Sequence, residues 1–112
     1  MQHNPQKLFH DIMIALNELE IFCNGKSFED FDNDRGFQLI VERELEILGE
    51  ALNRLRRDHT EEATDINDID KIIGLRNIIA HGYDVIDQEI LWDIVTNKIA
   101  ILKRDIEKKI KE

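Results

Sequence analysis

Apolar side chains recur at spacings of three and four residues along most of the chain, which is the period of an α-helix with one buried face. The first stripe predicts a helix from about residue 6 to residue 24. Gly25 is expected to close it, because glycine accepts the left-handed conformation that often ends a helix. The segment 26–36 mixes turn formers with two phenylalanines, and we expect an ordered connection that holds one helical turn.

Three further helices are predicted after this connection. One of the capping residues at 32–34 is expected to start a second long helix that ends near Arg57. A polar loop of about ten residues follows, and a third helix begins between positions 65 and 70 and stops at Gly82. Asp87 can cap a fourth helix, whose lysine-rich end suits the negative end of the helix dipole.

These elements predict an all-α fold, an antiparallel four-helix bundle that can hold an extra short helix. The 112 residues fit one domain, 1–112. The third helix differs from the others, because its apolar residues spread over more than one face: Ile72, Ile73, Leu75, Ile78, Ile79 and Ala80. Apolar surface on two sides indicates burial in the bundle and also against a partner, so we expect a homodimer.

Charge and cysteine usage narrow the function classes. The 24 acidic and 15 basic residues give a formal charge of −9, which argues against a protein that holds long nucleic acid electrostatically. A local basic cleft could still engage a short single strand, because attraction between exposed charges fades over ~8 Å at physiological salt. The single cysteine, Cys23, indicates a reducing compartment, and no signal peptide or membrane-spanning apolar run is visible. We expect a soluble, cytoplasmic protein.

The segment 76–84, RNIIAHGYD, gathers residues that can carry chemistry around a helix end. His81 lies in the last turn, where free carbonyls favour its protonated form. It could take or give a proton while an RNA phosphodiester is cleaved by its own 2′-hydroxyl. Arg76 could grip two phosphate oxygens and offset charge that develops in the transition state. This chemistry demands no metal or other cofactor, and the remaining histidines show no zinc-like spacing.

Helix geometry limits this interpretation. Arg76 and His81 lie about 140° apart around an ideal helix, whereas Asn77 and His81 share a face. One regular helix therefore does not aim all three groups inward together. Either the last turn unwinds, or copies from two subunits meet across a symmetric interface and form a composite cleft.

Structural roles are open for the same residues. His81 could simply cap its helix, and Tyr83 could pack with its hydroxyl tied to the backbone. Trp92 is expected at the edge of the core. Candidate structural partners of Arg76 are Asp70, Asp84 and Asp87. The lysine-rich tail is usually a solvated face, although three of its cations could attract phosphate: Lys98, Lys103 and Arg104.

Arg76, four intervening residues, His81, one residue and Tyr83 resemble the signature of the HEPN superfamily in its HepT-like branch, in which a polar residue such as Asn77 follows the arginine. The likeness covers nearly the whole chain in order and spacing. It includes the segments DIMIAL (11–16), ERELEILGEAL (42–52), RNIIAHGYDVID (76–87) and ILWDIV (90–95).

The resemblance implies a metal-independent endoribonuclease that works as a homodimer, with its motifs meeting at a shared cleft. It also implies a toxin that is encoded beside a minimal (MNT-type) nucleotidyltransferase antitoxin, which transfers AMP to the tyrosine of the motif, here Tyr83. Added phosphate beside Arg76 and His81 would occupy the substrate's place and cancel local positive charge.

Two other hypotheses stay open. One is a non-catalytic HEPN module that binds a nucleotide or a nucleotidyltransferase without cutting RNA. The other is a helical dimerisation protein in which the motif is structural. The presence of Arg76, Asn77 and His81 together favours the ribonuclease, because a binding module has no need of that set.

Overall fold

The computed structural model describes residues 4–81 and 86–111, with only the backbone of Ala80 and His81. Helices account for nearly all of this part of the chain. In chain order they are α1 (Pro5–Cys23), α2 (Phe28–Asp32), α3 (Arg35–Asp58), α4 (Thr60–Ala63), α5 (Ile69–His81), α6 (Gln88–Asp93), the π-helical turn η1 (Ile94–Lys98) and α7 (Ile99–Lys111). The prediction of an all-α bundle is confirmed.

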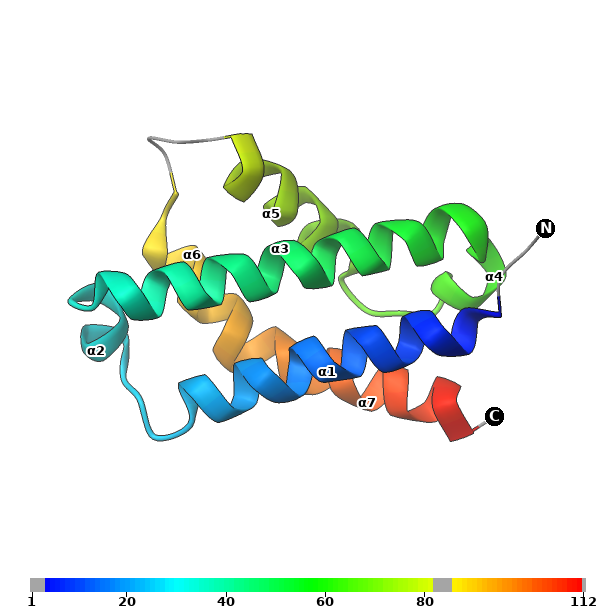
Figure 1. Ribbon diagram of the computed structural model, residues 1–112, viewed down its shortest axis with the longest axis horizontal. Coiled ribbons are helices and arrows are strands. Elements are labelled where there is room, and N and C mark those ends of the chain that lie inside the picture. Colours follow the sequence, from blue (N-terminus) through cyan, green and yellow to red (C-terminus); the bar gives the residue numbers. More distant parts are fainter. Residues whose placement is uncertain (1–3, 82–85, 112) are drawn as a thin grey trace.

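Four long elements run up and down in alternation (Figure 1). α3 packs against α5 on one side and α1 on the other, and α1 also packs against α7. The continuous run of α6, η1 and α7 passes behind α1, and α1 begins at the end of the bundle where α7 finishes (Figure 1). α3 is therefore the central helix, and it positions α5, which carries the predicted site.

Side-chain caps place the helix starts where the sequence indicated. The carboxylate of Asp34 accepts from the backbone N–H of Phe37 at the start of α3, and Asp87 caps α6 in the same way. Gly25 has a φ of 75°, the left-handed conformation expected after α1. The one-turn helix expected in the connection is α2, held by a capping box between Ser27 and Asp30.

Two local features differ from the sequence prediction. The stretch predicted as a loop after α3 contains the single-turn helix α4. The fourth helix is not regular, because η1 interrupts it between α6 and α7. In this region the hydroxyl of Thr96 donates to the carbonyl oxygen of Trp92 at 2.7 Å. Such back-bonding and extra-residue turns depend on local geometry that hydrophobic periodicity does not encode.

The core lies between α1, α3, α5 and α7 and is mostly aliphatic, with a cluster of three aromatic residues at one end. Phe31 is fully buried, stacks on Trp92 with ring centroids 5.1 Å apart, and meets Phe37 edge-on at 5.3 Å. Trp92 is partly buried against the core, which confirms its expected place at the core edge.

The apolar spread on α5 is used mostly inside the chain. Ile72, Ile73 and Leu75 are all buried in a single copy, whereas Ile78 remains 51% exposed. The bundle itself therefore buries the apolar residues of the first two turns of α5, and the expected homodimer stays a prediction. Among the side chains that the structure describes on α5, Ile78 is the one large apolar residue that is exposed.

None of the helices in residues 4–81 and 86–111 is both long enough and apolar enough to span a membrane.

Candidate functional site

Arg76 lies at a close approach between α5 and α3. A Cβ added to Gly49 of α3 would overlap the Cβ of Arg76 and would lie 2.9 Å from its Cγ. Glycine at position 49 thus leaves room for the stem of the arginine to rest directly on the backbone of α3. The close approach of the two helices determines where the guanidinium emerges.

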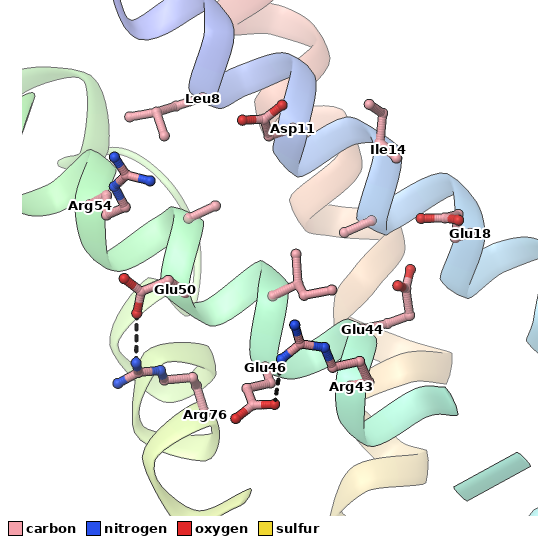
Figure 2. A pocket seen from close by; sticks show the side chains of 13 residues that line it. Leu8, Asp11, Ile14, Glu18, Arg43, Glu44, Glu46, Glu50, Arg54 and Arg76 are labelled. Atoms are coloured by element: carbon pink, nitrogen blue, oxygen red, sulfur yellow. Dashed lines mark hydrogen bonds and ion pairs between the residues drawn. The ribbon is translucent and has the colours of Figure 1, made fainter. Parts of the chain in front are cut away.

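The guanidinium of Arg76 is held at two of its three nitrogens. Nη2 lies 2.6 Å from Oε2 of Glu50 on α3 (Figure 2), and Nη1 donates to Oδ1 of Asn77 at 3.0 Å. Nε is buried and has no acceptor among the described residues. The side chain is 29% exposed, so part of the group remains accessible to a ligand.

This arrangement corrects the structural partners considered for Arg76. Asp70 pairs instead with Arg56. The carboxylate of Asp87 accepts hydrogen bonds from backbone N–H groups at the start of α6. Asp84 lies outside the described residues. The partner found for Arg76, Glu50, sits on another helix and was not a candidate from the sequence.

The structure describes some of the other predicted site residues and not others. Asn77 is exposed and contacts Arg76, so the structure brings these two together. His81 is the last residue of α5, and its side chain is outside what the structure describes. Tyr83 is also outside the described residues. Lys98 pairs with Asp68 and Lys103 with Glu20, so both of these cations are engaged within the chain.

A groove of about 500 Å³ runs between α1 and α3 and reaches Arg76 (Figure 2). Its charged lining mixes both signs, with three arginines and five acids: Arg43, Arg54, Arg76, Asp11, Glu18, Glu44, Glu46 and Glu50. Two exposed isoleucines, Ile14 and Ile47, also line it. The groove is therefore an amphipathic surface rather than a basic track.

The carboxyl group of Glu44 is unusual within this groove. Burial, followed by repulsion from Glu18 on α1, raises the pKa of Glu44 to about 7. Its Oε2 is buried without a hydrogen-bond partner among the described residues. Figure 2 shows the Glu44 side chain directed toward α1, on which Glu18 lies. This end of the groove can thus change its charge near neutral pH.

Gly49 and Glu50 were not predicted as site residues from the sequence. One signal was available, since an isolated glycine inside a strongly amphipathic helix usually marks a close packing contact. Periodicity alone could not name the partner, because Gly49 and Arg76 lie on different helices.

Among residues 4–81 and 86–111, no group of three or more His, Cys, Asp or Glu side chains is arranged to hold a metal ion. The polar groups near Arg76 are a carboxylate and an amide, both engaged with its guanidinium. The chemistry that this part of the site can supply is charge stabilisation by the arginine.

Comparison with known proteins extends the resemblance beyond the motif. The profile of a family described as "Ribonuclease HepT-like" matches residues 12–109. A protein of Methanocaldococcus jannaschii named "Putative RNase MJ1380" is 32% identical over 106 residues, covering 95% of this chain and 96% of the relative. A "Probable ribonuclease HepT" of Thermococcus cleftensis is 32% identical over 108 residues, covering 96% and 97%. No solved structure matches the chain significantly.

Proposed function

Because the chain belongs to the HepT-like ribonuclease family, we propose that it is the toxin of a toxin–antitoxin pair, a single-domain endoribonuclease that cleaves RNA without a metal. Arg76 and His81 carry the reaction at a cleft shared by two copies of the chain. The observation that carries the proposal is the family match over residues 12–109, which spans the whole motif. The single cysteine suits a cytoplasmic protein.

The proposed reaction uses the RNA's own 2′-hydroxyl. Its oxygen attacks the phosphorus and gives its proton to an imidazole of His81, and the 5′-oxygen leaves with a proton donated by an imidazolium. The products are a 2′,3′-cyclic phosphate and a 5′-hydroxyl end. Arg76 offsets the negative charge that builds on the non-bridging oxygens.

The composite cleft is supported by the course of α5. The backbone of the helix continues as far as His81, and positions 76 and 81 of a regular helix lie about 140° apart around its axis. Two copies related by a two-fold axis can place the arginine of one near the histidine of the other. The exposed Ile78 on α5 is available for such a contact.

Incubation with total RNA and with tRNA tests the activity. Wild type should cut RNA in the presence of EDTA and leave 2′,3′-cyclic phosphate ends, and Arg76→Ala and His81→Ala should each remove cleavage without a change in helicity. If wild type cuts no RNA but binds a nucleotidyltransferase, the chain is the non-catalytic HEPN module instead.

Subunit complementation tests the shared cleft. Arg76→Ala and His81→Ala proteins, mixed, unfolded and refolded together, should regain part of the wild-type rate, because mixed dimers combine an intact arginine with an intact histidine. Full inactivity of a mixture shown to contain mixed dimers would place both groups in one subunit.

Neutralisation is proposed to occur by AMP transfer to Tyr83 from a cognate minimal nucleotidyltransferase. Incubation with that enzyme and ATP should raise the mass by whole AMP units on Tyr83 and lower cleavage in proportion. Tyr83→Phe should stay active and resist neutralisation. An inactive Tyr83→Phe protein would assign the hydroxyl to substrate binding or catalysis.

A further inference from the structure

Two glutamates one turn apart on α3 each hold an arginine at the groove (Figure 2). Oε2 of Glu50 lies 2.6 Å from Nη2 of Arg76, and Oε1 of Glu46 lies 3.1 Å from Nη1 of Arg43. Residues four apart share a face of a helix, so Glu46 and Glu50 lie on the same side of α3 and each forms an ion pair with an arginine. Only one of them involves a residue of the proposed cleavage site.

The contacts of Arg76 leave its guanidinium little rotational freedom. Glu50 holds one end, Asn77 holds the other, and the stem rests on the backbone at Gly49. A planar fork gripped at two nitrogens has a defined orientation, which a cation held at one point would not have. The carboxylate of Glu50 thus contributes direction as well as charge.

We propose that Glu50 is a positioning residue for Arg76, whose carboxylate holds the guanidinium in the orientation that meets the scissile phosphate. The inference rests on the proposed function of Arg76 in RNA cleavage. Glu50 acts through the arginine and does not itself touch the reacting atoms.

Stability alone does not account for this ion pair. Glu50 is 47% exposed, and exposed pairs contribute little to folding because water and salt screen them. Orientation at a reacting centre matters much more, since a displacement of about 1 Å can cost roughly 100-fold in rate. Removing Glu50 should therefore affect the reaction far more than the fold.

Binding and chemistry should respond in opposite directions. The negative charge of Glu50 stands beside the place where a phosphate must bind, so its removal relieves repulsion and frees the charge of Arg76. The same change releases the guanidinium from its orientation. We expect RNA to bind at least as tightly and to be cleaved more slowly, a split that loss of structure would not produce.

The experiment compares Glu50→Gln with the matched control Glu46→Gln, which removes the same charge one turn away and does not touch Arg76. Cleavage is measured at saturating tRNA. Affinity is measured with a fluorescent single-stranded 2′-O-methyl oligonucleotide, which cannot be cut. Glu50→Gln should cleave about 10- to 100-fold more slowly, with an unchanged or lower Kd. Glu46→Gln should cleave within about twofold of wild type.

A spectroscopic readout reports orientation without cleavage. The Nε–H of Arg76 is buried, so its ¹⁵N–¹H signal should exchange slowly with water in wild type and in Glu46→Gln. In Glu50→Gln this signal should broaden or exchange faster. An unchanged signal would show that Glu50 does not order the guanidinium and would overturn the proposal.

The remaining outcomes distinguish a failure of the positioning role of Glu50 from a failure of the proposed function. Wild-type or faster cleavage by Glu50→Gln overturns the positioning role, and faster cleavage would mean that Glu50 restrains the arginine. An equal fall in Glu46→Gln assigns the effect to the general charge of the groove. If Arg76→Ala cleaves as wild type does, or wild type cuts no RNA, the proposed function fails and the catalytic meaning of Glu50 fails with it.

Discussion

Gly49 of α3 faces the side-chain stem of Arg76 on α5 with no room for a methyl group between them. A Cβ at position 49 would overlap the arginine's Cβ, whereas it would only touch the carbonyl oxygen of Ile72 at 3.4 Å, so the stem of Arg76 is what blocks it. The two helices meet at this point because a glycine stands there. The contact between Gly49 and Arg76 thus sets both how α3 packs on α5 and where Arg76 lies.

Replacing Gly49 with alanine is expected to separate α3 and α5 locally and to displace Arg76. The clash should cost about 1–3 kcal/mol of stability, offset in part by the ~1 kcal/mol by which alanine favours a helix over glycine. Cleavage should fall more than stability, because the arginine moves with α5. Urea unfolding and cleavage of tRNA measure the two effects.

Gly74→Ala is the control for this substitution. Gly74 lies on α5, and a Cβ there would have no neighbour within 4 Å. Alanine should therefore stabilise the protein, by up to about 1 kcal/mol, through helix propensity alone. Equal stability changes at positions 49 and 74 would contradict the proposed contact.

Phe31→Ala should destabilise the protein by about 3–5 kcal/mol, because it leaves a cavity between Phe37 and the ring of Trp92. Trp92 is the only tryptophan, so its fluorescence reports on this cluster directly. The emission maximum should shift to longer wavelength as water reaches the indole. A folded variant with unchanged emission would argue against the stacking of Phe31 on Trp92.

The pH dependence of stability should carry a signature of Glu44. Burial and the charge of Glu18 raise the pKa of Glu44 to about 7 in the folded state from an ordinary value of 4.5. The folded state therefore holds its proton more tightly than the unfolded state, so this group's contribution to stability is greatest below pH 4.5 and is lost as the pH rises through 7. Glu44→Gln should remove that loss.

Urea unfolding at pH 5, 6, 7 and 8 measures the effect of Glu44→Gln. Its stability relative to wild type should increase across this series, most steeply below pH 7, between the unfolded and folded pKa values, and should level off above pH 7. Glu18→Gln should shift the transition to lower pH, because it removes the second cause of the raised pKa. A constant difference between Glu44→Gln and wild type at all four values would mean that Glu44 titrates normally.

Cys23 is expected to be a slow nucleophile. Burial raises the pKa of its thiol to about 11, so little thiolate is present at pH 8. Iodoacetamide should modify the native protein at least about 10-fold more slowly than the urea-unfolded chain, even after allowing for the greater nucleophilicity of a more basic thiolate. Mass spectrometry follows the single adduct, and equal rates would contradict the burial of Cys23.

The sequence determined the local structure of this protein to a large extent. Helix periodicity and capping depend on residues within a few positions of one another, so the caps at Asp34 and Asp87 and the turn at Gly25 could be predicted. The motif that includes Arg76 and His81 is also local, and with the helical frame it indicated the ribonuclease family.

Only the tertiary structure decided how the parts of the site meet. Glu50 and Gly49 reach Arg76 because α3 and α5 pack together, and the face that each helix presents depends on the whole core. The same packing buried Ile72 and Ile73 in one copy and left Ile78 exposed. Contacts between helices depend on the relative rotation and approach of their axes, which no local sequence pattern specifies.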